Sequence, residues 1–287
     1  MRIGYACLNR SLPSAGKTFR LASYSEAKFR ETVQHNLDAL QQLLEFNVEH
    51  NLLFHRISSN TIPFASHPIQ TVDWQEEFAE QLSSIGTCIK NNGFRISMHP
   101  DQFVLINAKD PKIVEKSIGD LSWHADFLDA LGLDTTAKIQ IHVGGVYGDK
   151  EAAIARFVHE HKRLPSKIQR RLAIEHDDRL FSVRDCMVIH KQTGIPVIFD
   201  NLHHECLHNG ETQEEAMQQL AITWKKEDGI PLVDYSMQAP GERVGKHAQT
   251  LDDKHFTTFI KHVPIDCDIM LEIKDKEPSA IRAKALC

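Results

Sequence analysis

Short apolar segments alternate with amphipathic segments along almost the whole chain. Eight of the apolar segments are rich in Ile, Val, Leu and Phe and are mostly flanked by Gly or Pro, which is typical of buried parallel strands. These predicted strands cover Ile3–Leu8, Leu52–Ser58, Arg95–His99, Ile139–Val143, Leu172–His176, Pro196–Asp200, Pro231–Ser236 and Asp268–Ile273.

Between these strands, apolar residues recur at steps of three or four, which predicts helices. The first has Leu37, Leu40 and Leu44 on one face, and Ser23 with Glu26 ahead of it has the spacing of a capping box. Further helices are predicted to begin near Asp73, Asp110, Lys150, Ser182, Thr212 and Pro278, with one more around Phe256–Ile260.

Strands that alternate with helices in this way indicate an α/β protein. We predict a single (β/α)8 TIM barrel that spans residues 1–287 as one domain. An open, doubly wound sheet is the alternative. No G-x-G-x-x-G or Walker-type phosphate loop follows any predicted strand, which disfavours a nucleotide-binding sheet.

The composition of the chain further narrows the class of protein. The formal charge of -6 argues against a protein that coats nucleic acid by charge alone, but it allows an enzyme with local phosphate contacts. The six cysteines have no C-x-x-C spacing, which indicates reduced thiols and excludes a zinc ribbon. No apolar run is long enough to span a membrane, and Met1–Tyr5 has the pattern of a strand, so we expect a cytoplasmic protein.

Metal-binding side chains stand at or just beyond the ends of six successive predicted strands. A single histidine there is usually structural, and a single aspartate is usually a helix cap. In a barrel, however, all these strand ends meet at one face, where crowded carboxylates are costly unless cations bind them. The candidate ligands are His99, His142, Glu175, Asp200, His203, Asp234, His247 and Glu272.

Mixed imidazole and carboxylate ligands suit Zn²⁺, Mn²⁺ and similar ions, and eight ligands exceed the need of one ion. Clusters of two or three ions support in-line displacement at a phosphodiester. Sugar isomerases and epimerases on barrels also use two metals, so that class is a second hypothesis. A non-enzymatic module that binds metal or nucleic acid is a third.

The order of motifs resembles the UV damage endonuclease family, which is related to the endonuclease IV type. The resemblance covers the chain from residue 2 to about residue 280. It rests on Gly4–Asn9, Arg56–Ser59, Ser66–Pro68, His99–Phe103, Ile141–Gly145, Ile174–Asp178, Phe199–His204, Gly245–Ala248 and Glu272–Lys276.

This resemblance implies an enzyme that nicks damaged double-stranded DNA immediately 5′ to a lesion. Pyrimidine dimers and 6-4 photoproducts are the implied substrates, with abasic sites as a further candidate. A metal-activated water would attack the phosphodiester and leave a 3′-hydroxyl and a 5′-phosphate. The implied cofactors are two or three divalent ions, Mn²⁺ first and Zn²⁺, Co²⁺ or Mg²⁺ as alternatives. No obligate protein partner is implied.

The resemblance also assigns roles to the ligands. His99, His142 and Glu175 would hold one ion, while His203 and His247 would hold a third. The second ion would lie among four carboxylates, which are Glu175, Asp200, Asp234 and Glu272. Glu175 would bridge the first two ions. Glu175, Glu272 and Asp200 would form the catalytic set. Asp234 stands where some family members have histidine, and Leu232 stands where those members have a lysine that is carboxylated.

Lesion recognition is implied for loops at the same face. Gln102 and Phe103 match a polar and aromatic pair that is pushed into the duplex, although Phe103 could instead pack its own loop. Tyr5, Asn9 and His67 match positions in the lesion pocket. The remaining candidates for DNA contact are lysines beside the ligands, which are Lys246, Lys274 and Lys276.

Overall fold

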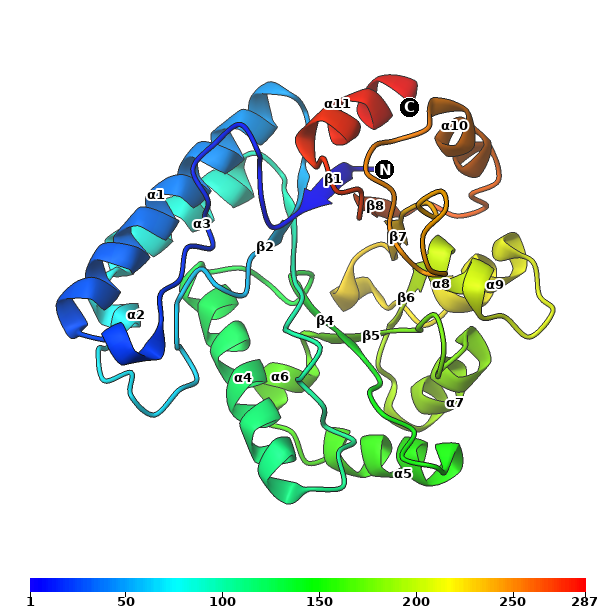
Figure 1. Cartoon of the computed structure of the whole chain (residues 1–287), viewed down its shortest axis with the longest axis horizontal. Helices are drawn as coiled ribbons and strands as arrows, with labels where there is room; N and C mark the ends of the chain where they lie inside the picture. Colours follow the sequence, from blue (N-terminus) through cyan, green and yellow to red (C-terminus); the bar gives the residue numbers. More distant parts are fainter.

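The computed structural model describes residues 1–287 and has eight parallel strands that close into a barrel in sequence order. Helices form a ring around the strands (Figure 1). The predicted (β/α)8 barrel is therefore confirmed. The strands are β1 (Ile3–Ala6), β2 (Phe54–Ile57), β3 (Arg95–Met98), β4 (Lys138–His142), β5 (Leu172–Glu175), β6 (Val197–Asp200), β7 (Leu232–Tyr235) and β8 (Asp268–Leu271).

All the predicted helices are present, and three short ones, α2, α6 and α8, were not predicted separately. The helices are α1 (Glu26–Glu49), α2 (Trp74–Glu77), α3 (Ala79–Asn91), α4 (Pro111–Ala130), α5 (Lys150–His161), α6 (Ser166–Gln169), α7 (Val183–Thr193), α8 (Asn201–Cys206), α9 (Gln213–Ala221), α10 (Asp253–Lys261) and α11 (Glu277–Leu286). Two 3₁₀ turns, η1 (Leu21–Ser23) and η2 (Lys226–Asp228), complete the set.

Most of the predicted helix starts have the expected caps. Thr212 and Glu215 form a capping box at α9, and Ser182 with Asp185 forms another at α7. The predicted cap at Ser23 is wrong, because Ser23 belongs to η1. Ser25, which has an extended backbone, instead accepts a hydrogen bond from the Lys28 amide and begins α1 two residues later than expected.

Side chains on the strands alternate between two apolar regions. In β5, Leu172 and Ile174 join a core of 62 buried residues that the helices cover, whereas Ala173 lies in a separate apolar cluster. This second cluster takes one residue from each of six strands, which places it inside the barrel. Its members are Ala6, Phe54, Ala173, Ile198, Leu232 and Met270. Glu175 shares the inward face with Ala173 and stands one layer further toward the strand ends.

Two ion pairs, each with at least one fully buried partner, lie at the opposite, N-terminal end of the barrel. Lys138 at the start of β4 binds the carboxylate of Asp228, and the guanidinium of Arg2 lies 3.0 Å from Asp268 at the start of β8. The carboxylates and imidazoles predicted to bind metal are all at the other end. None of the helices combines the length and the apolar character needed to cross a membrane.

Candidate metal centre

Glu175, at the end of β5, is the point on which the predicted ligands converge. Its Oε2 lies 3.5 Å from His99 Nε2 and 3.7 Å from His142 Nε2, while its Oε1 lies 2.8 Å from His203 Nδ1. Two groups of ligand atoms each fall within 4.8 Å of one another, namely His99 with His142 and Glu175, and Glu175 with Asp200 and His203. The predicted sharing of Glu175 by two groups thus has a geometric basis.

Three of the histidines use Nδ1 to contact a backbone carbonyl. These contacts are His99 to Pro100 at 2.9 Å, His203 to His176 at 3.1 Å and His247 to Glu272 at 2.8 Å. Such a contact fixes the orientation of the ring and leaves Nε2 available as a metal ligand. The ring positions are thus set by the backbone of the strand ends.

The charges at the centre suit a divalent cation. Burial raises the pKa of Asp200 to about 7, and its Oδ2 is buried without a hydrogen-bond partner. Although burial opposes ionisation of Glu175, the neighbouring His142 and His203 hold its pKa well below the usual range. A buried carboxylate oxygen with no donor, beside imidazole nitrogens, is a good ligand environment for such an ion. The residues present therefore fit a metal centre.

Three other predicted ligands have different neighbours. Both carboxylate oxygens of Asp234 lie 2.8 Å from Nη2 of Arg56, and Nη1 of the same guanidinium contacts Glu272. Glu272 also lies 3.6 Å from His247 Nδ1. The ring of His247 is 6.5 Å from that of His203, so the predicted third pair shares one rim but is not among the compact ligand groups.

Arg56 and Gln140 are functional candidates that the sequence analysis did not identify. Both are buried, Arg56 on β2 and Gln140 on β4, at inward positions level with the ligands. Their signal was present in the sequence, because a polar residue flanked by apolar ones on a buried strand must face the barrel interior.

The loop after β3 exposes Gln102 and Phe103, the pair that is predicted to enter the DNA duplex. Phe103 has 73% of its surface exposed, and Gln102 beside it is also exposed. The Asp101 carboxylate accepts a hydrogen bond from the Phe103 amide at 3.0 Å, which fixes the turn. Phe103 therefore does not pack its own loop, and its ring is free to contact a ligand. His67, in the loop after β2, is exposed as well.

The predicted contact of Tyr5 with a lesion needs correction. Tyr5 is fully buried and faces α1, where its hydroxyl donates to Asn47 at 2.7 Å and accepts from Asn9 at 2.9 Å. The odd positions of β1 point outward to the helices, so Tyr5 cannot reach a DNA strand. Asn9 is also buried, and its Oδ1 accepts from the Ser11 amide. These two residues hold the first loop in shape.

A groove of about 780 Å³ extends from the metal centre between the loops after β1, β7 and β8. His99, His247 and Glu272 line it, so it opens directly onto the candidate ligands. Besides the buried Arg56, five basic side chains line it: Arg10, Arg243, Lys246, Lys274 and Lys276. The predicted lysines thus line the groove, although Lys246 is paired with Glu242 at 2.6 Å.

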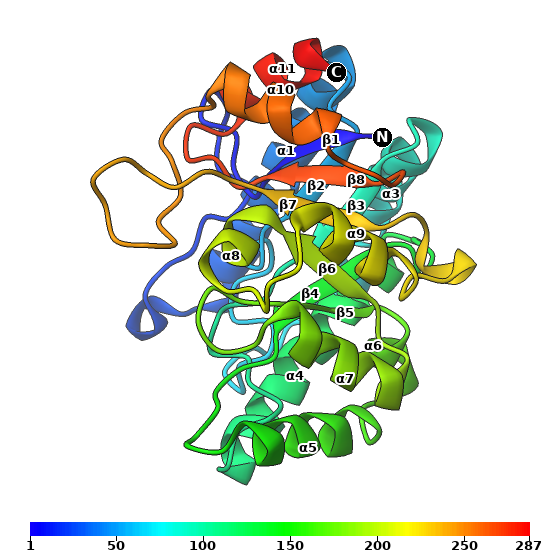
Figure 2. The same cartoon turned by 90° about the vertical axis from the view of Figure 1, so that its right-hand side faces the viewer.

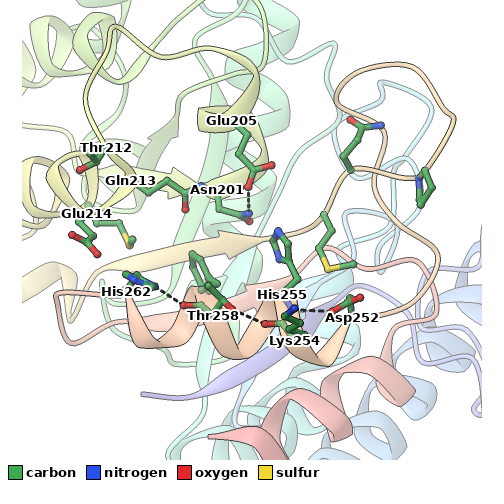
Figure 3. Close-up of a pocket in the computed structure, with 15 residues that line it drawn as sticks. Asn201, Glu205, Thr212, Gln213, Glu214, Asp252, Lys254, His255, Thr258 and His262 are labelled. Carbon is green, nitrogen blue, oxygen red and sulfur yellow. Dashed lines mark hydrogen bonds between the residues drawn. The ribbon is translucent and has the colours of Figure 1, made fainter.

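A second cavity, of about 810 Å³, lies outside the barrel among α8, α9 and α10 (Figure 3). Its polar groups bind one another, as in the hydrogen bonds from His255 to Asp252 at 2.8 Å and from Asn201 to Glu205 at 3.3 Å. It contains none of the candidate metal ligands. Its carboxylates make it a poor environment for a phosphate backbone.

The fold and these residues together define a TIM-barrel protein whose strand ends carry a cluster of His, Asp and Glu side chains that could hold metal ions. The family model described as UV-endonuclease UvdE matches residues 1–285, and the chain belongs to that family. A protein named UV DNA damage endonuclease from Clostridium perfringens is 41% identical and covers 98% of this chain and 69% of its own length. One of the same name from Bacillus cereus is 32% identical over 96% of this chain and 91% of its own.

Solved structures agree with the fold. The crystal structure of SacUVDE has a TM-score of 0.96 and 48% identity, and the match covers all of this chain and 98% of the other. A D-psicose 3-epimerase from Clostridium cellulolyticum H10 has a TM-score of 0.59 at 12% identity, over all of this chain and 96% of the other. That second likeness shows a common barrel and nothing about the reaction.

Proposed function

We propose that this chain is a metal-dependent UV damage endonuclease. It cuts the DNA backbone immediately 5′ to cyclobutane pyrimidine dimers and 6-4 photoproducts, and it leaves a 3′-hydroxyl and a 5′-phosphate. Abasic sites are a further candidate substrate. The names of its relatives and its membership of the family support this proposal.

The observation that carries the proposal is the pair of ligand groups that share Glu175. Divalent ions bound to these groups would supply an activated water and neutralise charge on the scissile phosphate. His99, His142 and Glu175 would hold one ion. Glu175, Asp200 and His203 would hold another. Mn²⁺ is the ion we favour, because oxygen and imidazole ligands suit it.

The chain itself supplies the positioning of the DNA. Basic side chains of the groove, such as Arg10 and Lys274, would bind phosphates on the side of the damaged strand next to the metal centre. Phe103 would stack in place of bases that leave the helix at the lesion, because its ring is exposed and its loop is braced by Asp101. Glu272, which lines the same groove, adds a further carboxylate beside the candidate metal ligands.

A nicking assay tests the proposal. Supercoiled plasmid, irradiated or intact, is incubated with the purified protein and Mn²⁺, with and without EDTA. We expect nicks only in irradiated plasmid and only without EDTA. Sequencing-gel analysis of a duplex with one defined dimer should show a break 5′ to the dimer, with an end that a polymerase extends. Equal nicking of intact plasmid would rule out lesion specificity.

Glu175→Gln provides the matched loss of function, because the amide keeps the size of the side chain and removes its charge. We expect nicking to fall at least about 100-fold, since even residues behind the ligands contribute 10–100-fold in metal sites. Circular dichroism should show an unchanged fold. Wild-type activity in this variant would remove Glu175 from the centre.

A further inference from the structure

Arg56 is a buried cation among the candidate metal ligands. Only 3% of its surface is exposed, and its guanidinium lies between strands β2, β4, β7 and β8. Nη2 is 2.8 Å from both carboxylate oxygens of Asp234 and 2.9 Å from Gln140 Oε1, while Nη1 contacts Glu272. A fixed positive charge thus occupies the space beside the carboxylates of β7 and β8.

Asp234 and Asp200 stand side by side on neighbouring strands but have opposite surroundings. They are register partners on β7 and β6, and both are fully buried. Oδ2 of Asp200 has no hydrogen-bond partner, whereas Oδ2 of Asp234 accepts hydrogen bonds from both Arg56 and Gln140. Asp234 also accepts from Arg56 through Oδ1. Only Asp200 offers a free oxygen to an ion.

Gln140 connects Asp234 to the shared ligand. Its Oε1 accepts from Arg56, so its amide nitrogen faces the two carboxylates, and Nε2 donates to Glu175 Oε2 at 2.6 Å as well as to Asp234. The Arg56–Asp234 pair thereby orients Gln140, and Gln140 orients Glu175. A contact of this kind behind a metal ligand sets its geometry.

We infer that Asp234 is the counter-ion of Arg56 and a positioning residue for Glu175, and that it does not bind an ion itself. The ions at this end of the barrel are then held by the two ligand groups that share Glu175, namely His99 with His142 and Asp200 with His203. The inference rests on the proposed metal-dependent function, and it departs from the role that we predicted for Asp234 from the family. An ion on Asp234 would have to displace a buried guanidinium or lie against it, and like charges repel strongly in a buried site.

The number of bound ions tests the inference without DNA. Each protein is equilibrated with Mn²⁺ alone, freed of excess ion by gel filtration and measured by inductively coupled plasma mass spectrometry, while calorimetric titration gives the affinities. We expect Asp200→Asn to hold one ion fewer per chain than the wild type. Asp234→Asn should hold the wild-type number, with affinity about tenfold weaker, as for residues behind a metal ligand.

Two further variants separate the effects of charge and folding. Asp268→Asn removes an equally buried aspartate that pairs with Arg2 at the far end of the barrel, and it should change neither ion number nor affinity. The double variant Arg56→Gln with Asp234→Asn removes both charges together, so no unpaired guanidinium repels the ions. It should also hold the wild-type number, with its fold checked by circular dichroism.

Loss of one ion in the double variant, as in Asp200→Asn, would show that Asp234 is a ligand and would overturn the inference. A wild-type protein that binds no Mn²⁺ would overturn it together with the proposed function. Normal ion binding without any nicking of irradiated plasmid would overturn the proposed function alone, because the ion count does not depend on the substrate.

Discussion

Phe103 exposes nearly three quarters of its surface at the face of the barrel that also holds the candidate metal ligands. Exposure of an aromatic ring to water is unfavourable, and stacking of the ring on a base removes it from water. Each such stacking contact contributes about 1–3 kcal/mol to binding. We therefore predict that Phe103→Ala weakens binding to a dimer-containing duplex about 5- to 150-fold while leaving Mn²⁺ affinity unchanged. Fluorescence anisotropy with a labelled duplex measures the first quantity and calorimetry the second.

Ile222→Ala is the control for this prediction. Ile222 is 75% exposed but follows α9, at the opposite end of the barrel from the ligands. This variant should bind the damaged duplex as the wild type does. Equal affinity of Phe103→Ala and wild type for the damaged duplex would reject the stacking role.

His161, at the end of α5, is buried and neither ring nitrogen has a partner. Burial lowers its pKa from 6.5 to about 4, so the folded chain takes up a proton at a lower pH than the unfolded chain does. The neutral His161 side chain therefore contributes fully to the free energy of unfolding above pH 6.5, and this contribution is lost as the pH falls toward 4. We predict that His161→Phe reduces this acid-induced loss of stability by about 1–3 kcal/mol.

Urea unfolding of wild type and variant at several pH values between 4 and 7 tests the acid effect. The phenyl ring should also stack on Phe157, which the imidazole already faces in parallel at 6.4 Å. His159→Phe, at an exposed position of the same helix, should keep the wild-type pH dependence. Parallel pH profiles for wild type and His161→Phe would contradict the prediction.

At the level of elements, the strands were predictable because both their faces are apolar. Leu172 and Ile174 face the helices while Ala173 faces the barrel interior, which gives a continuous apolar run in the sequence. The capping box at α9 was predictable because it is a contact between near neighbours. The cap of α1 was not, because Ser23 and Ser25 are both acceptable caps and only the backbone of the preceding loop selects Ser25.

The candidate centre was predictable only in part, for a similar reason. Strand-end positions identify which residues meet, so their gathering at one face followed from the sequence, whereas the sharing of Glu175 was implied only by the family resemblance. The partner of each carboxylate depends on side chains from distant strands. Asp200 and Asp234 have the same sequence signal, yet one has a free oxygen and the other a guanidinium from β2.

The loop between β7 and α10 projects from the barrel (Figure 2), and the side chain of Gln238 makes several of the hydrogen bonds within it. The Gln238 amide donates to the carbonyls of Ala239 and Arg243 at 3.0 and 2.9 Å, and its Oε1 accepts from the Gly245 amide at 2.8 Å. Backbone pairing between Gln238 and His247 closes the loop and fixes the position of His247. Gln238 thus braces the loop beside the candidate ligand His247.

We predict that Gln238→Ala makes this loop mobile. Each lost hydrogen bond costs about 0.5–1.5 kcal/mol, so the loop should open locally while the barrel stays folded. Limited trypsin digestion should cut faster at Arg243 and Lys246 in this variant, with the sites identified by mass spectrometry. Gln218→Ala, at an exposed position of α9, should leave the cleavage rate unchanged. Unchanged cleavage in Gln238→Ala would show that other contacts hold the loop.

For the whole molecule, the formal charge of -6 and the proposed DNA substrate are reconciled by where the charges lie. Five basic side chains in addition to Arg56 line the groove beside the candidate metal centre, and divalent ions would offset the carboxylates there. The acidic remainder of the surface repels DNA that approaches in other orientations. Charge would therefore guide the duplex to one face of the barrel instead of attracting it everywhere.

This distribution predicts a modest dependence of DNA affinity on salt. Each neutralised phosphate contributes about 0.9 to the slope of log affinity against log salt, so four or five contacts give a slope of about -4. Lys274→Ala should make the slope less steep by about 1, because one phosphate contact is lost. Lys162→Ala, exposed beyond the end of α5 and far from the groove, should not change it. Anisotropy titrations of a damaged duplex between about 50 and 200 mM salt measure these slopes. If Lys162→Ala and Lys274→Ala gave the same slope, the duplex would not lie in the groove, and the orientation proposed for the DNA would have to be abandoned.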